Sequence, residues 1–149
     1  MNKHFAALEQ EGKIERVTAG RAEVERLHAI VARDLATAEE LQARNRDWAL
    51  VILYNALLQA CVALMAAHGY RARGESPHKT IVEFARLVLP EQHDLVEGLD
   101  RLRRRRHRAV YDVAGQVSRL EVEEGFALAR KVLPILQDVA KRRLAEGRK

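Results

Sequence analysis

The 149-residue sequence is poor in the residue types that mark disulfide-stabilised and β-rich proteins. It has one cysteine, three prolines and only 5% aromatic residues. Because Cys61 has no second cysteine to pair with, nothing indicates an oxidising compartment, and we expect a cytoplasmic protein. No stretch alternates apolar and polar residues for long enough to predict a sheet.

Motifs for metal, cofactor and nucleophilic chemistry are also missing. The six histidines, at positions 4, 28, 68, 78, 93 and 107, include no His-x3-His pair and have no metal-ligand spacing to Cys61. There is no glycine-rich loop that would cradle a phosphate, and neither Ser76 nor Ser118 lies in a nucleophile elbow. We therefore expect neither a metal site nor a cofactor.

A membrane span is not expected either. The longest apolar stretch, Trp48 to Ala67, is interrupted by Asn55 and Gln59, and the N-terminus lacks the continuous apolar segment of a secretory signal. We interpret this stretch as the central helix of a bundle, with its side chains mostly buried. The residues expected to be buried are Val51, Leu53, Leu57, Leu58, Cys61, Val62 and Leu64.

Leu, Ala, Val, Glu and Arg dominate the composition, which predicts an all-α protein without strands. Residues 1–19 are expected to form a helical arm, and residues 20–149 one helical domain. Ser118 and Glu121 have the spacing of a capping box. The predicted helices of the domain span residues 22–43, 48–68, 80–89, 90 to about 112, and 119–144, with Pro134 as a possible kink in the last.

Six arginines lie within eight positions of the fourth predicted helix and form the arginine cluster. They are Arg101, Arg103, Arg104, Arg105, Arg106 and Arg108. The formal net charge of the chain is only +5, so its basic excess is local. Guanidinium groups form forked, charge-assisted hydrogen bonds to phosphate, which makes Arg103, Arg104, Arg105 and Arg108 candidate contacts to nucleic acid. The alternative is a solvated basic face near a helix C-terminus.

One ridge of this helix carries candidate catalytic groups. Arg103, His107 and Tyr111 are four residues apart and share a helix face. Histidine exchanges protons near neutral pH, and its arginine neighbours disfavour a positive charge, which leaves it available as a base. An arginine can stabilise the charge that develops on a reacting phosphate. The candidate catalytic residues are Arg101, Arg106, His107 and Tyr111.

Five segments, taken in order, resemble a known family. They are Arg33-Asp34-Leu35, residues 49–64 with the Tyr54-Asn55 pair, Gly69-Tyr70-Arg71, residues 78–84, and Arg106-His107-Arg108-Ala109-Val110-Tyr111-Asp112. Together they make residues 20–145 similar to the HEPN domains. The resemblance implies an antiparallel up-and-down bundle of four or five helices, usually a homodimer. Active members are metal-independent ribonucleases. Many are toxins encoded beside a small nucleotidyltransferase antitoxin, and others serve in defence systems.

The resemblance leaves two alignments of the family's catalytic motif, Arg-Asn-x3-His-x-Tyr, open. Without gaps, Arg106 takes the arginine position, His107 the asparagine position, Tyr111 the histidine position and Val113 the tyrosine position. A second alignment pairs Arg101 with His107 and so retains both an arginine and a histidine.

Three hypotheses follow from these patterns. The favoured hypothesis is a catalytically degenerate module that binds RNA or another polyanion, a nucleotide or a nucleotidyltransferase partner without cleaving anything. The second is a metal-independent ribonuclease, in which His107 is the base and Arg101 or Arg106 stabilises charge. The third is a purely structural helical dimer.

Overall fold

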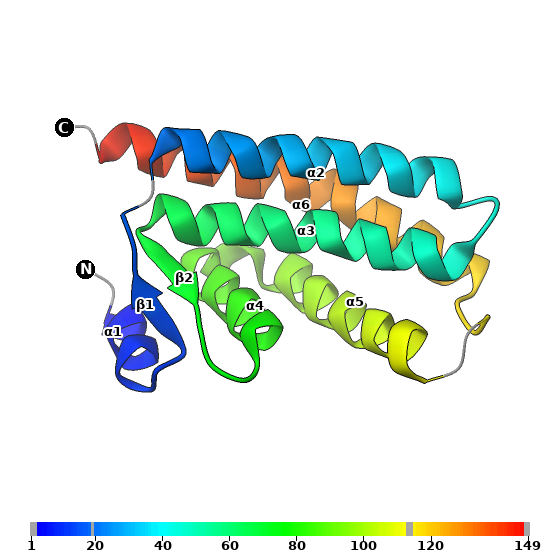
Figure 1. Ribbon diagram of the computed structural model, residues 1–149, viewed down its shortest axis with the longest axis horizontal. Helices are drawn as coiled ribbons and strands as arrows, with labels where there is room; N and C mark the ends of the chain where they lie inside the picture. Colours follow the sequence, from blue (N-terminus) through cyan, green and yellow to red (C-terminus); the bar gives the residue numbers. More distant parts are fainter. Residues whose placement is uncertain (1–2, 19, 113–114, 148–149) are drawn as a thin grey trace.

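The computed structural model describes residues 3–18, 20–112 and 115–147, most of them in helices. Six α-helices and two short strands are assigned in these ranges (Figure 1). In chain order they are α1 (Lys3–Gln10), β1 (Ile14–Arg16), α2 (Arg21–Leu41), α3 (Arg46–Ala67), β2 (Tyr70–Ala72), α4 (Pro77–Val88), the 3-10 turn η1 (Pro90–Gln92), α5 (His93–Tyr111) and α6 (Arg119–Glu146).

The long helices run up and down (Figure 1). α2 and α3 lie antiparallel and are joined by a short turn, α5 runs back beside α3, and α6 returns along α2 and α3. α4 is shorter and packs against α3 and α5. The all-α bundle that composition and periodicity predicted is therefore confirmed.

α3 is the centre of the core. It contacts α2, α4, α5 and α6, and Leu50, Leu53, Leu57 and Leu64 are fully buried. By length and composition α3 is apolar enough to cross a membrane, but 72% of its most apolar window is buried inside the fold. Its apolar composition is thus explained by its central position in the bundle.

Most predicted burials in α3 are confirmed, with two exceptions. Leu53, Leu57, Leu58, Cys61 and Leu64 are buried, whereas Val51 and Val62 are only half-buried. The reason is that α3 is covered on several sides but not all, and these two valines lie toward the uncovered side.

Side-chain caps set where two helices begin. The Asn45 side-chain oxygen accepts from the Trp48 backbone N–H at 3.1 Å, so α3 begins at Arg46, two residues before the predicted start. The Ser118 hydroxyl accepts from the Glu121 backbone N–H and the Glu121 carboxylate accepts from the Ser118 N–H, which confirms the predicted capping box. α6 is continuous through Pro134.

The prediction of a structure without strands was wrong. β1 and β2 pair antiparallel, with Ile14 opposite Ala72 and Arg16 opposite Tyr70. Each strand has only three residues, too few to show an alternating pattern, and the partners lie more than 50 positions apart in sequence. Gly69, with φ of +85°, turns the chain out of α3 and into β2, in a region predicted as a loop.

The N-terminal segment shares the core of the bundle. The predicted helical arm contains α1 and β1, and its Phe5, Leu8 and Ile14 are buried in the same hydrophobic cluster as α3. The Phe5 ring stacks on Phe84 of α4, with centroids 4.4 Å apart. The predicted boundary falls at Ala19, which lies outside the described residues.

Candidate functional site

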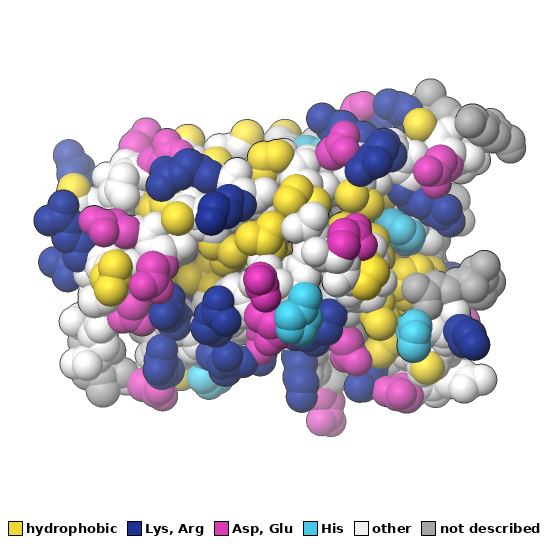
Figure 2. All heavy atoms as spheres, turned by 180° about the vertical axis from the view of Figure 1, so that it is seen from behind, with side chains coloured by type: hydrophobic (Ala, Val, Ile, Leu, Met, Phe, Trp, Pro, Cys, Tyr) yellow, Lys and Arg dark blue, Asp and Glu magenta, His cyan; other side chains and the backbone are white. Residues whose placement is uncertain are grey.

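α5 fixes the positions of the arginine cluster. Val96, Leu99 and Leu102 are buried against the core and set the rotation of the helix about its axis. The arginines that follow within the next two turns therefore point in several directions rather than along one face. In Figure 2 this region lies at the lower left, where a group of basic side chains adjoins acidic ones.

Two arginines of the cluster pair with an acid of their own helix. The Arg103 Nε donates to Asp100 Oδ1 at 3.0 Å, and Arg104 donates to the other carboxylate oxygen. Burial alone would raise the pKa of Asp100, but the Arg103 hydrogen bond and the nearby guanidinium charges lower it. Asp100 thus holds two guanidinium groups in place and offsets one of their charges.

Two others face α6. Arg105 lies 3.3 Å from the Glu121 carboxylate and 3.1 Å from that of Glu124, and Arg108 lies 3.9 Å from Glu121. The Arg105 side chain is 25% exposed, against 63% for Arg108. Arg105 therefore joins two helices, while Arg108 stays open to a ligand.

A cavity of about 390 Å³ lies between the start of α4 and the ridge of α5, and is called here the α4–α5 cavity. From α5 it is lined by Arg103, Arg106, His107 and Tyr111. From α4 and the residues before it, the lining is Glu75, Ser76, Pro77, His78 and Lys79. The predicted ridge of Arg103, His107 and Tyr111 thus faces one open cavity, and the His107 and Tyr111 rings are 4.7 Å apart between centroids.

Two features make this cavity suited to an anion. Five basic side chains line it, two arginines, two histidines and one lysine, against the single carboxylate of Glu75. It also lies at the N-terminal end of α4, where the helix dipole favours negative charge. No group of three His, Cys, Asp or Glu side chains that could hold a metal ion occurs within residues 3–18, 20–112 and 115–147.

His78 is held in place from α3. Its Nδ1 lies 3.4 Å from the hydroxyl of Tyr54, a buried residue. The Arg106 guanidinium lies over the Tyr54 ring, 5.9 Å from the ring centroid. Partial burial lowers the pKa of His78 most, and the charges of Arg106 and Arg103 lower it further, so the neutral imidazole is favoured.

A hydrogen-bonded network of α2 and α3 side chains lies beside His78 and Arg106. Asn55 Nδ2 donates to Asp34 Oδ2 at 2.7 Å, and Arg33 Nε donates to Asp34 Oδ1 at 3.0 Å. Asp34 is only 7% exposed. A smaller cavity of about 270 Å³ connects the elements of this network, and its polar lining residues are Arg33, Asp34, Thr37, Tyr54, Asn55, His78 and Arg106.

Four of the five segments behind the family resemblance therefore converge in space, while Gly69-Tyr70-Arg71 follows the end of α3 and does not line this cavity. The Arg33-Asp34 pair comes from α2, the Tyr54-Asn55 pair from α3, His78 from α4 and Arg106 from α5, and all line this smaller cavity. The match of the family model described as HEPN domain covers residues 24–139, most of the chain. The chain belongs to the HEPN domain family. Comparison with curated proteins gives no match.

The structure separates the predicted catalytic residues of this HEPN domain. Arg106, His107 and Tyr111 line the α4–α5 cavity, but Arg101 does not. Arg101 is exposed and lines a neighbouring surface hollow, whose other lining residues are Arg103, Arg104, Arg105, His107 and Arg108. His107 thus borders both spaces, with Arg106 in the cavity and with Arg101 in the hollow. Val113, which takes the family's tyrosine position, lies outside the described residues.

Sequence reasoning did not identify His78 and Lys79 as site residues. They lie 29 and 28 positions before His107, on another helix, so no local spacing joins them to the arginine cluster. The one signal was the resemblance of residues 78–84 to the family, which placed His78 in a family segment without giving it a role.

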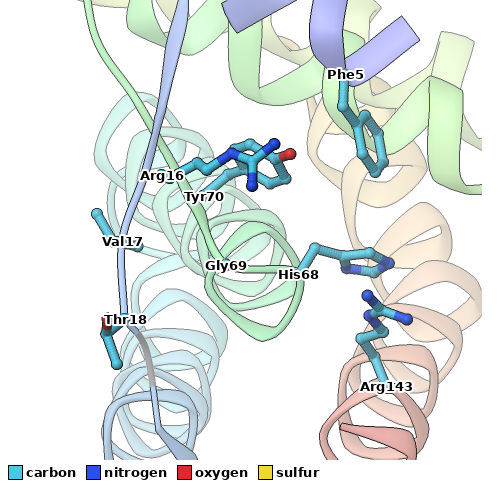
Figure 3. A pocket seen from close by; sticks show the side chains of 8 residues that line it. All are labelled: Phe5, Arg16, Val17, Thr18, His68, Gly69, Tyr70 and Arg143. Carbon is cyan, nitrogen blue, oxygen red and sulfur yellow. The ribbon is translucent and has the colours of Figure 1, made fainter. Parts of the chain in front are cut away.

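A second cavity, of about 590 Å³, lies at the opposite end of the bundle (Figure 3). Figure 3 shows the His68 ring between Phe5 and the Arg143 guanidinium, with Arg16 against Tyr70. Arg16 lies 3.2 Å from the Glu9 carboxylate, and Arg143 lies 3.8 Å from that of Glu146. Both arginines of this cavity face carboxylates, whereas in the α4–α5 cavity Arg103 pairs with Asp100 but Arg106 lies over the Tyr54 ring. This cavity therefore attracts an anion less than the α4–α5 cavity does.

Proposed function

We propose that this HEPN protein binds single-stranded RNA, with one phosphate of the backbone in the α4–α5 cavity. The observation that carries the proposal is that Arg103, Arg106 and His107 from α5 share one open cavity with His78 and Lys79 from α4. Forked guanidinium groups and a helix N-terminus are both suited to phosphate oxygens.

The surface around the cavity favours a chain of phosphates over a single one. Arg101, Arg104 and Arg108 are exposed and continue the basic surface along α5 beyond the cavity. Tyr111 is 64% exposed beside His107 and offers an aromatic face on which a base can stack. Basic tracks with interspersed aromatic rings are typical of proteins that bind single-stranded nucleic acid.

The proposal is tested by the salt dependence of binding. The double variant Arg103→Ala/Arg106→Ala should bind a fluorescein-labelled 20-nucleotide single-stranded RNA more weakly. The slope of log K against log salt should flatten by about 0.7 for each phosphate contact that is lost. Fluorescence anisotropy at several salt concentrations measures both quantities.

The matched control removes the same two charges elsewhere. Arg130 and Arg142 are exposed on α6, so Arg130→Ala/Arg142→Ala should leave the slope almost unchanged. If the two double variants change the slope equally, binding depends on net charge alone, and the arginine cluster is only a solvated face.

Cleavage of the bound RNA is the second candidate function. Arg106 and His107 line the same cavity, which gives a phosphate both a charge-stabilising group and a proton-exchanging group. Arg101 shares the neighbouring hollow with His107 but lies outside this cavity, whereas Arg106 lines the cavity together with both His107 and His78. We therefore propose Arg106 rather than Arg101 for the charge-stabilising role.

We further propose that the protein acts as a homodimer and that a nucleotidyltransferase encoded beside it is a partner. Val110 and Tyr111, at the end of α5, are exposed apolar side chains next to the basic surface, as is Leu120 at the start of α6. Burying them against a second copy would bring two basic surfaces together around one RNA. Light scattering on the samples used for binding gives the number of chains per RNA.

A further inference from the structure

We propose that His78 is a catalytic residue of this site and acts with His107 as a base–acid pair that cleaves RNA. The proposal rests on the RNA-binding function proposed above. It adds a residue from α4 that lies outside the arginine cluster and assigns His107 the acid role rather than the base role.

The two histidines reach one cavity from different elements. His78 is at the first turn of α4 and His107 is near the end of α5, and Arg103 and Arg106 line the same space. A phosphodiester cleaved by its own 2′-hydroxyl needs a base at the attacking oxygen, an acid at the leaving oxygen and a cation for the equatorial oxygens. The α4–α5 cavity contains all three kinds of group.

The environments of the two histidines differ in a way that separates their roles. His78 is half-buried, and its Nδ1 meets the Tyr54 hydroxyl, so in the tautomer that donates from Nδ1 its Nε2 carries the free lone pair. His107 is exposed at the rim, with Tyr111 beside it. His78, whose ring is held by a hydrogen bond, therefore suits the role of the base. The exposed His107 suits the role of the acid, which must exchange protons with water.

Charged and titratable groups face His78 from four elements. They are Tyr54 from α3, Arg103, Arg106 and His107 from α5, Arg33 and Asp34 from α2, and Glu75 and Lys79 from its own segment. The nearby positive charges outnumber the two carboxylates, which favours the neutral imidazole needed for a base. Asp34 accepts from Asn55 and Arg33, so its charge is already engaged.

The reaction balances without a metal or a co-reactant. The Nε2 of His78 takes the proton of the ribose 2′-hydroxyl, and the 2′-oxygen forms a bond to phosphorus. The bond from phosphorus to the 5′-oxygen breaks, and the imidazolium of His107 gives its proton to that oxygen. The products are a 2′,3′-cyclic phosphate and a 5′-hydroxyl, and water returns both histidines to their starting protonation.

The test measures single-turnover cleavage of a 20-nucleotide RNA at saturating protein, so that weaker binding does not affect the rate. His78→Ala and His107→Ala should each lower the rate by about 100-fold or more. The rate of the unchanged protein should rise with pH as His78 loses its proton, and this acidic limb should disappear in His78→Ala. Mass spectrometry should find the cyclic phosphate.

His93 provides the matched control, because it is an exposed histidine at the start of α5, outside the cavity. His93→Ala should cleave at the unchanged rate. His78→Gln keeps a polar side chain of similar size, and circular dichroism of both His78 variants shows whether they fold. A loss of cleavage in folded His78→Gln supports the proposal even if His78→Ala unfolds.

Two results separate this proposal from the binding function. If the unchanged protein binds the RNA but yields no cyclic phosphate, or His78→Gln cleaves at the full rate, the role of His78 is wrong while RNA binding stands. If the unchanged protein does not bind the RNA at all, the proposed function fails and this inference fails with it. An all-deoxy 20-mer should bind but stay intact, since it lacks the attacking hydroxyl.

Discussion

At the scale of single residues, the site depends on a buried polar group, the carboxylate of Asp34. Asp34 is buried on α2, whose other buried residues are all apolar. Its two oxygens accept from Arg33 and Asn55, so it links α2 to α3 under Arg106 and His78. A buried carboxylate of this kind is tolerated because both of its oxygens have partners.

We therefore expect Asp34→Ala to destabilise the protein by about 1–2 kcal/mol, because it leaves the Asn55 amide without its acceptor. Urea unfolding followed by circular dichroism measures the change. Asp138→Ala is the control, since Asp138 is 64% exposed and pairs with Arg142 on the surface, and its loss should cost less than about 0.5 kcal/mol. Equal losses in the two variants would contradict the assigned role of Asp34.

At the scale of elements, the close packing of the helices depends on two glycines. A Cβ at Gly125 of α6 would lie 2.9 Å from the Leu53 side chain, which is fully buried in α3. A Cβ at Gly98 of α5 would lie equally close to Leu128, which is only half-buried and has room to move. The same clash therefore has different consequences at the two positions.

Gly125→Ala should lower the free energy of unfolding by about 1 kcal/mol, since overpacking a buried site outweighs the gain in helix propensity. Gly98→Ala should be neutral or stabilising by up to about 0.5 kcal/mol, because Leu128 can shift. Thermal and urea unfolding of both variants test the contrast. If the Gly125→Ala protein is more stable than the unchanged one, α3 and α6 leave room for a Cβ at Gly125, and the assigned close packing is wrong.

At the scale of the whole molecule, partly buried histidines connect stability to pH. Burial lowers the pKa of His28, His68 and His78 below the ordinary value of 6.5. The unfolded chain therefore binds protons at these positions at a higher pH than the folded chain does. It follows that the free energy of unfolding falls as the pH drops through 6.5 toward the lower folded values.

Urea unfolding at a series of pH values between 8 and 5 should show this loss. His68→Gln should reduce the loss, because His68 is partly buried beside Phe5 and burial lowers its pKa, whereas the exposed His93→Gln should not. A stability that rises on acidification over this range would contradict the assignment.

The sequence by itself determined the all-α fold, the central position of α3, the capping box of α6 and the arginine cluster. Each of these depends on local spacing, on composition or on neighbours in the chain. Resemblance to the HEPN family, which the family match confirms, came from short segments in a fixed order.

Only the tertiary structure decided which of the arginines share a cavity and what lies across from them. Arg105 pairs with acids of α6, Arg101 lines a separate surface hollow, and Arg103 and Arg106 share a cavity with His78 of α4. The β1–β2 pair and the Asp34–Asn55 bond likewise join residues more than 20 positions apart. Spacing along one helix predicts a shared face, but the partners of that face depend on how the helices pack.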